Sequence, residues 1–279
     1  MQYNKRIVKK IESYCFSKPG AYESGRLGIY PISYRIVGKS FAHFYRQEDF
    51  YKVTLGCRPE QAEIDRRLYP GVVVRGYHCP QRQHLHWNTI DLFAFDDDKR
   101  LYQMIDEAYD AIAEELTPKA KSQLLELARC EYVDTDGSNA EFAMLCSKLD
   151  QALDDLVGSK FQRSQYEQYN TREQIHDVIV IYRNGRPVAC GGFKTYDQEH
   201  AELKRIFTDK SCRGIGLGEE IVRRLEAKAK MKGYIWCILE TGKPLKAACH
   251  LYTKMGYEVI PNYGQYVDMP ESICMRRKI

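Results

Sequence analysis

The feature that most constrains the fold of this chain is a glycine-rich turn at residues 213–218, with the sequence Arg-Gly-Ile-Gly-Leu-Gly. The segment before it, HAELKRIFTD, is typical of a strand, and the segment after it has the apolar spacing of an amphipathic helix. Glycines let backbone amides approach an anion without a Cβ atom in the way, and a helix N-terminus adds free N–H donors. The turn therefore fits either a pyrophosphate site or a tight structural loop. Its spacing matches neither a P-loop nor the GxGxxG motif.

The residues around this turn predict a domain that mixes strands and helices. Asn184-Gly185 separates two strand-like segments and is the strongest hairpin signal in the chain. The other expected elements are a strand at 130–135, a helix opened by Asp136, Gly137 and Ser138, a helical piece near 162–169, a strand at 234–242, a helix and turn at 245–257, and a final strand at 271–279.

The first part of the chain has its own alternation of elements, and a length of 279 residues favours two domains. A break at Thr117-Pro118 follows a helix that begins with three aspartates. We expect an α+β domain at 1–117, a linker or short helix at 118–129, and a second domain at 130–279. The expected elements of the first domain are helices at 4–16, 58–67 and 96–116 and strands within 33–45, 50–57 and 84–92.

Several segments of the first domain resemble the MmcQ/YjbR family. They are KPGAYES, RIVGKSFAHFY, YPGVVVRGYH and HLHWNTIDL, followed by the helix that holds EAYDAIAEEL. The resemblance covers residues 1–117 and implies a small double-wing α+β fold of the frataxin-like kind. Proteins of this family are often described as DNA-binding, and the family has no catalytic signature to transfer.

The second domain resembles the GNAT family of N-acetyltransferases. The turn fits the GNAT pattern Arg/Gln-x-x-Gly-x-Gly/Ala, it follows a strand that ends IFTD, and LYTKMGYEV fits the later helix and turn of that family. The resemblance covers about 150 residues. It implies a mixed, mainly antiparallel central sheet and acetyl-CoA as co-substrate. The implied reaction moves the acetyl group to an amine by direct attack in a ternary complex.

The resemblance also implies positions for the coenzyme and for the general acid. Backbone amides of Arg213, Gly214, Ile215, Gly216, Leu217 and Gly218 would hold the pyrophosphate. An amide of Ile206, Phe207 or Thr208 would bind the thioester carbonyl. Tyr252 matches the tyrosine that lies near the thiol in the family and would protonate it, although a merely packed phenol is the alternative.

Glu202 is the expected general base. It lies eleven residues before Arg213, the separation at which some family members carry a catalytic glutamate. Strand alternation predicts that Glu202, Lys204, Ile206 and Thr208 share one face. Glu202 could instead pair with Lys204 or contact substrate, and Glu240 on the adjacent strand is the alternative base.

The acceptor expected from this resemblance is an amine on a small molecule or a protein. Its specificity is expected to depend on residues 139–170 and 262–270, for which no motif stands out. The alternative function is a regulator that binds nucleic acid or another macromolecule through residues 1–117, with the GNAT domain as an acetyl-CoA sensor. The charge is +8 up to Ile90 and −7 from Asp91 to Thr117, which supports a nucleic-acid surface only weakly.

The remaining patterns argue against other classes of site. His78, Cys79, His84 and His86 match no standard zinc spacing, so no metal is expected. Neighbours on a helix point about 100° apart, so Cys249 and His250 do not form a catalytic pair. No stretch reaches the roughly 18 apolar residues of a membrane span, and no secretory signal is apparent at the start. We expect a cytoplasmic location, in which the ten scattered cysteines remain reduced.

Overall fold

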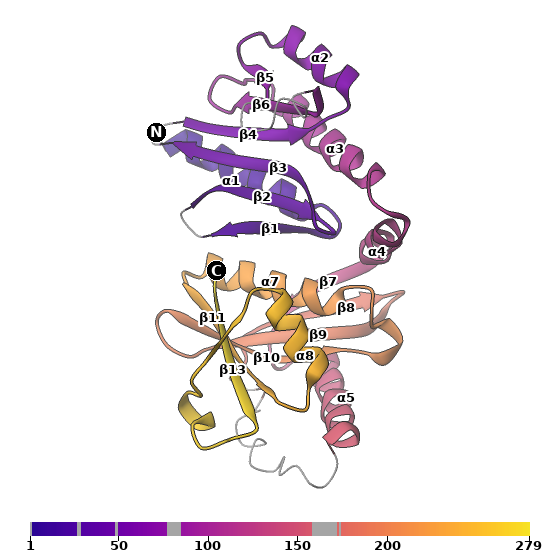
Figure 1. The fold of residues 1–279 in the computed structure, drawn as a ribbon, viewed down its shortest axis with the longest axis vertical. Coiled ribbons are helices and arrows are strands. Elements are labelled where there is room, and N and C mark those ends of the chain that lie inside the picture. Colours follow the sequence, from indigo (N-terminus) through magenta and orange to yellow (C-terminus); the bar gives the residue numbers. More distant parts are fainter. Residues whose placement is uncertain (1, 27–28, 48–49, 77–84, 158–171, 173) are drawn as a thin grey trace. The chain divides into compact units, whose positions relative to one another are not determined.

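The computed structural model describes every residue except 1, 27–28, 48–49, 77–84, 158–171 and 173 (Figure 1). The chain forms two compact units, Met1–Ala128 and Arg129–Ile279. The expected linker segment is a helix that belongs to the first unit. No helix among the described residues combines the length and apolar character that crossing a membrane requires.

The first unit contains one six-stranded sheet in the order β1-β2-β3-β4-β6-β5. Every neighbouring pair of strands in it is antiparallel. The elements are α1 (Gln2–Ser17), β1 (Ala21–Arg26), β2 (Ile29–Ile36), β3 (Lys39–Gln47), β4 (Phe50–Gly56), α2 (Pro59–Leu68), β5 (Val73–Arg75), β6 (Trp87–Asp91), α3 (Asp98–Glu114) and α4 (Pro118–Ala128).

The core of the first unit lies between this sheet and the helices α1 and α3. The side chain of Asp97 caps α3 by accepting a 2.9 Å hydrogen bond from the amide of Arg100, as the aspartates at the head of this segment predict. Leu124 of α4 packs into the same core. Helix α4 is therefore held by burial of apolar surface in the first unit.

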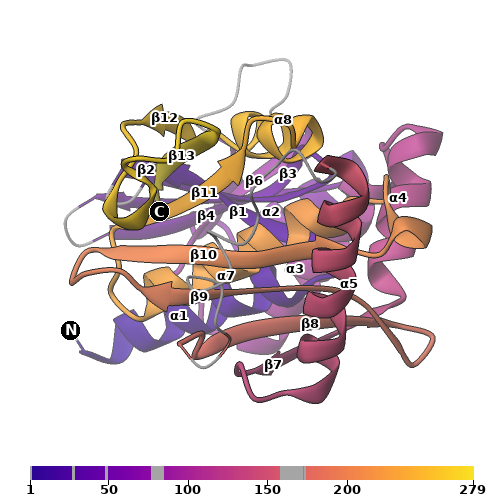
Figure 2. The ribbon, with the colours of Figure 1, turned by 90° about the horizontal axis from the view of Figure 1, so that it is seen from below.

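The second unit contains a seven-stranded sheet in the order β12-β13-β11-β10-β9-β8-β7. Only the β10–β11 pair is parallel, which confirms the predicted mixed and mainly antiparallel sheet. Helices α5 and α7 cover opposite faces, and α5 crosses in front of β8, β9 and β10 in Figure 2. The elements are β7 (Cys130–Thr135), α5 (Ala140–Val157), β8 (Asp177–Arg183), β9 (Arg186–Thr195), β10 (His200–Thr208), α7 (Leu217–Met231), β11 (Trp236–Gly242), α8 (Lys246–Lys254), β12 (Glu258–Ile260) and β13 (Ser272–Lys278), with short 3₁₀ turns at Lys210–Cys212 and Gly264–Tyr266.

Local chemistry explains two boundaries in this unit. Asn184 and Gly185 have φ values of 52° and 72°, the left-handed pair that a tight hairpin between β8 and β9 requires. Helix α5 is capped by Asn139, whose side chain accepts from the amide of Phe142 at 2.8 Å. Asp136 instead binds Ser138 in the preceding turn, so the helix begins later than expected. The helical piece predicted near 162–169 lies outside the described residues.

The parallel pair β10–β11 opens along its length. Pairing joins His200, Ala201 and Glu202 to residues 236–238 and then stops, although both strands continue. β10 stays paired with β9 and β11 stays paired with β13, so β10 and β11 separate from each other. We call this opening, formed by residues 203–208 of β10 and 239–242 of β11, the strand fork.

Candidate active site

The glycine-rich turn joins the end of β10 at the strand fork to the start of α7. Gly214 and Gly216 have φ values of 82° and 92°, and Gly216 is the N-cap of α7. A non-glycine residue is strained in this left-handed region, so both glycines are required by the path of the chain. The Arg213 side chain stabilises the turn, because its Nε donates a hydrogen bond to the carbonyl of Thr208 at 3.2 Å.

The turn presents a group of backbone donors. Within the described chain, the amides of residues 214–219 donate to no protein acceptor, whereas the amide of Arg213 donates to the carbonyl of Lys210 at 3.5 Å. A Cβ added at Gly214 would meet no atom within 4 Å. Unpaired amides at a helix N-terminus and open space in front of them are what an anion such as a pyrophosphate needs.

Gly218 connects this turn to the helix that carries Tyr252. A Cβ at Gly218 would lie 3.4 Å from Leu251 Cδ2 of α8 and 3.9 Å from the Thr208 hydroxyl of β10. The first turn of α7, the end of β10 and α8 therefore meet at one point. The residue after Leu251 is Tyr252, so the predicted acid lies on the helix that packs against the predicted coenzyme turn.

Tyr252 is buried, with 7% of its surface exposed, and its ring lies 5.7 Å from that of Tyr257. Burial, and to a lesser degree the nearby Glu240 and Cys249, raise the pKa of its phenol above the usual value of 10. The phenol therefore stays protonated at neutral pH, as a general acid requires.

The predicted alternation of β10 is wrong beyond Lys204. Register with β9 jumps from Lys204–Gly192 to Phe207–Cys190, and Arg205 has a φ of 58°, which defines a β-bulge. Gly192 lies on the face of Lys204, whereas Ile206 Cδ1 approaches Gly191 on the opposite face, beside Ile221 and Leu225 of α7. The bulge thus separates Glu202 and Lys204 from Ile206, and it turns Phe207 toward the α5 side.

Glu202 lies at the mouth of the strand fork and is fully buried. Its Oε1 atom accepts hydrogen bonds from Tyr263 and Tyr266, each at 3.2 Å, and is 3.1 Å from Lys204 Nζ. Its Oε2 atom is 3.5 Å from Lys194 Nζ and has no hydrogen-bond donor among the described residues. Oε1 is therefore held by hydrogen bonds and an ion pair, whereas Oε2 is buried beside Lys194 and accepts no hydrogen bond from the described residues.

Lys204 completes this cluster. Its ammonium donates to the hydroxyl of Tyr266, and burial lowers its pKa against the opposing effect of Glu202. The pairing of Glu202 with Lys204 is the alternative that the sequence left open. Lys194, Tyr263 and Tyr266 were missed, because they lie on other strands and turns. The aromatic residues in 262–270 were the only available signal.

Glu240 lies one strand away on β11, where its side chain accepts from Ser272 Oγ at 2.7 Å. Burial raises the pKa of its carboxyl, and the hydrogen bond from Ser272 lowers it. Lys204 also lowers this pKa and Glu202 raises it, both to a smaller degree. The structure therefore keeps two carboxylates near the fork, one inside an ion-pair cluster and one bound to a neutral hydroxyl.

Two further patterns in the sequence concern metal ligands and a thiol–imidazole pair, and neither is expected to form a site. No group of three or more His, Cys, Asp or Glu side chains in these ranges could hold a metal ion. His78, Cys79 and His84 lie outside the described residues. The thiol of Cys249 points to the carbonyl of Gly242 at 3.8 Å rather than to an imidazole.

Comparison with known families agrees with this geometry. The model of the acetyltransferase (GNAT) family matches residues 144–257, which contain the fork, the turn and Tyr252. The YjbR model matches residues 16–111 of the first unit. The two matches do not overlap and follow the two-unit division of the chain.

Individual relatives match one unit each. An IAA acetyltransferase of Azospirillum brasilense is 29% identical over 137 residues, which cover 48% of this chain and 88% of that protein. The uncharacterized protein YjbR of Escherichia coli is 30% identical over 121 residues, 42% of this chain and 96% of that protein. The structure of a GNAT-family acetyltransferase from Staphylococcus aureus is 14% identical, with a TM-score of 0.44 over 53% of this chain and 98% of that one.

These matches cover nearly the full length of the YjbR relative and most of the acetyltransferase. The chain belongs to the YjbR family through its N-terminal unit, and its C-terminal unit contains a GNAT acetyltransferase domain, which makes the protein an acyltransferase.

Proposed function

We propose that the protein transfers the acetyl group of acetyl-CoA to a primary amine by direct attack in a ternary complex. One observation carries this proposal. The strand fork, the bulge in β10 and the unpaired amides at the start of α7 follow one another within a single strand-turn-helix unit. We also propose that residues 130–279 contain the whole transfer site and that residues 1–117 form a separate module.

The backbone of this unit holds the coenzyme. Amides of residues 213–218 bind the pyrophosphate, with those of 214–218 free to donate. An amide among Ile206, Phe207 and Thr208 donates to the thioester carbonyl, where negative charge develops during attack. The bulge matters for this step because it turns the backbone at the point where β10 has lost its β11 partner.

Glu202 removes the proton of the acceptor ammonium. Its Oε2 atom is the proposed proton acceptor, while Lys204, Tyr263 and Tyr266 fix the orientation of the carboxylate through Oε1. Glu240 is the competing base, because burial raises the pKa of its carboxyl and so makes its carboxylate more basic.

Tyr252 protonates the leaving thiolate. Burial keeps its phenol neutral, and Leu251, the residue before it on α8, packs against the start of α7. A proton donor of this kind contributes about 10²-fold or more to the rate when it is correctly placed.

The proposed location is the cytoplasm. Six of the nine cysteines in the described chain are buried, as Cys190 and Cys237 are. Buried thiols of this kind suit a reducing compartment.

Turnover tests the proposal directly. The intact protein is incubated with acetyl-CoA and a panel of primary amines of small molecules and peptides, and thiol release is followed together with the mass of the acetylated product. Amine-dependent release with a product heavier by one acetyl group is expected. Coenzyme binding without turnover on any amine would instead favour an acetyl-CoA sensor in a regulatory protein.

A further inference from the structure

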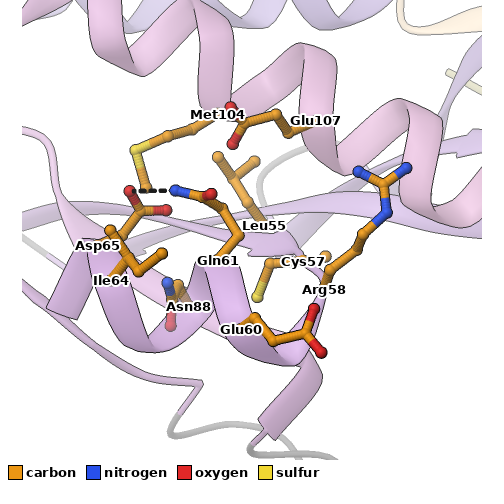
Figure 3. Close-up of a pocket in the computed structure, with 11 residues that line it drawn as sticks. Leu55, Cys57, Arg58, Glu60, Gln61, Ile64, Asp65, Asn88, Met104 and Glu107 are labelled. Carbon is orange, nitrogen blue, oxygen red and sulfur yellow. Dashed lines mark hydrogen bonds between the residues drawn. The ribbon is translucent and has the colours of Figure 1, made fainter.

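A concave site lies within the first unit and uses no residue of the second unit. A cavity of about 210 Å³ opens between α2, the adjoining ends of β4 and β6, and α3 (Figure 3). All its lining residues belong to the first unit.

The floor of this cavity is apolar. Leu55 of β4 and Met104 of α3 line it and are buried, with 1% and 4% of their surfaces exposed. Ile64 of α2 stands at the rim and is 48% exposed. Figure 3 shows these side chains around the same space as Asp65 and Glu107. Apolar walls with a few convergent polar groups are the usual composition of a small-molecule site.

Two of the polar groups are carboxylates that share one guanidinium. Arg100 donates to Asp65 Oδ1 at 2.7 Å and to both oxygens of Glu107 at 2.7 and 2.9 Å. The Asp65 side chain is only 3% exposed, so water screens its charge poorly. One positive charge therefore serves two negative charges beside the cavity.

The residues at the rim of the cavity do not neutralise this excess of negative charge. Arg58 lines the cavity, but its guanidinium is bound to Glu114, which lies outside the lining. Glu60 lines the cavity from the first turn of α2 and forms no ion pair with any residue that the structure describes. The guanidinium of Arg66 donates to Asn88, which lines the cavity, at 2.7 Å. With Arg58 paired to Glu114, the three lining carboxylates therefore exceed Arg100 and Arg66 by one negative charge.

Size and charge together define a ligand class. An apolar cavity of roughly 150 Å³ in a protein holds a benzene molecule, so this cavity accepts a slightly larger body. An excess of negative charge in a poorly screened site attracts a cation and repels an anion.

We propose that the first unit binds a small organic cation in this cavity, with its ammonium or amidinium group toward Asp65, Glu107 and Glu60 and its apolar body against Leu55, Ile64 and Met104. This site is independent of the acetyl-transfer proposal, since it uses no residue of the second unit.

Benzylamine is the probe, and benzyl alcohol and benzoate are the neutral and anionic probes of the same shape. Binding to the intact protein is measured by calorimetry, and its place is read from Cys57, whose thiol lines the cavity. Iodoacetamide labelling of Cys57 is followed by peptide mass spectrometry with and without each probe. Benzylamine is expected to bind and to slow labelling of Cys57, benzyl alcohol to bind about tenfold more weakly, and benzoate not to bind.

Variants on the exposed side of α2 locate the site without disturbing the core. Ile64→Trp is expected to close the rim and abolish binding of benzylamine. Glu60→Gln is expected to weaken it by about two- to fivefold, the range for an exposed ion pair. Glu63→Gln is the matched control, because Glu63 is on the same helix, pairs with Arg67 and does not line the cavity.

Three results would overturn the proposal. They are labelling of Cys57 that benzylamine does not slow, binding of benzoate as tight as that of benzylamine, and unchanged benzylamine binding in folded Ile64→Trp. The first two would show that the cavity is empty or merely apolar, and the third that the amine binds elsewhere, for example at the acceptor site.

Discussion

Each unit of this protein buries a carboxylate among cations, but with different chemistry. In the first unit Asp65 is held by the guanidinium of Arg100, which is always charged and binds in a fixed planar geometry. In the second unit Glu202 is held by two lysines and two phenols. The pKa of Lys204 is lowered by burial, so protonation in the second cluster depends on its surroundings. The first cluster holds a fixed charge, whereas the second is the one that we propose exchanges a proton with the acceptor.

The two sheets that carry these clusters also differ in how their strands pair. Every neighbouring pair of strands in the first sheet is antiparallel, whereas the second sheet has one parallel pair that separates after three residues. Separation of strands exposes backbone donors and makes room for a substrate, at the cost of ladder hydrogen bonds. Chemistry is therefore expected where pairing stops, at Glu202, and structural stability where it continues.

Glu202→Gln is expected to have the largest effect. Glutamine keeps the shape of the side chain but cannot accept the acceptor's proton, so kcat should fall by about 10²- to 10⁴-fold. Steady-state kinetics with the best amine measures this fall, and acetyl-CoA binding checks that the variant is folded. Glu240→Gln is the matched variant on β11. A larger loss in Glu240→Gln would assign the base to Glu240 instead.

Tyr252→Phe is expected to lower kcat by about 10²-fold with little change in acetyl-CoA affinity, because only proton donation to the thiolate is removed. Burial raises the pKa of this phenol above its usual value, so its neutral form persists through the alkaline range. Wild-type kcat should therefore show no loss from Tyr252 as the pH rises from 7 to about 10. A kcat in the phenylalanine variant equal to that of the wild type would leave Tyr252 a packing residue.

Asp65→Asn is the corresponding change in the first cluster and should reduce stability. Loss of the charged hydrogen bond to Arg100 is expected to cost about 1.5–3 kcal/mol of unfolding free energy, with Glu107 keeping the guanidinium paired. Urea denaturation measures this difference in the intact protein. A variant as stable as the wild type would show that the hydrogen bond between Asp65 and Arg100 does not contribute to the free energy of unfolding.

Asp209→Asn is expected to have the smallest effect, and one that depends on pH. The amide of Ser211, followed by Lys148, lowers the pKa of Asp209 from 3.8 to about 2. A carboxyl with a lowered pKa in the folded state adds stability above pH 3.8, and this stability is lost as the pH falls to 2. Because the ion pair is solvent-screened, we expect a difference of about 0.5–1 kcal/mol at pH 7.

Denaturation curves at several pH values test this difference between wild type and Asp209→Asn. The two proteins should differ above pH 4 and converge toward pH 2. A constant difference over the whole range would contradict the role of the ionised carboxylate.

Local signals predicted much of the fold. The hairpin at Asn184-Gly185, the strand at Cys130–Thr135 and the helix headed by Asp97 depend on residues close in sequence, and the structure confirms them. The start of α5 was predicted too early, because Asp136 and Asn139 are both good capping residues and only the tertiary fold selects Asn139.

The site was less predictable than the fold. Alternation along β10 failed at Arg205, since a bulge depends on the register with β9 rather than on the residues of β10 alone. The contacts of Glu202 with Tyr263 and Tyr266 join residues more than 60 positions apart, and no periodicity in the sequence encodes them. The roles of Glu202, Tyr252 and the turn amides stay predictions.

The central claim is that the turn at the start of α7 binds acetyl-CoA, and calorimetric titration of the intact protein tests it most directly. Gly214→Val is compared with Gly233→Val at the other end of α7. Both glycines have positive φ values, 82° and 95°, and neither would bring a Cβ within 4 Å of another atom, so the two substitutions impose similar backbone strain. We predict micromolar binding by the wild type and by Gly233→Val, and affinity at least about tenfold weaker in Gly214→Val. Equal affinities in the two variants, or no binding by the folded wild type, would contradict the account.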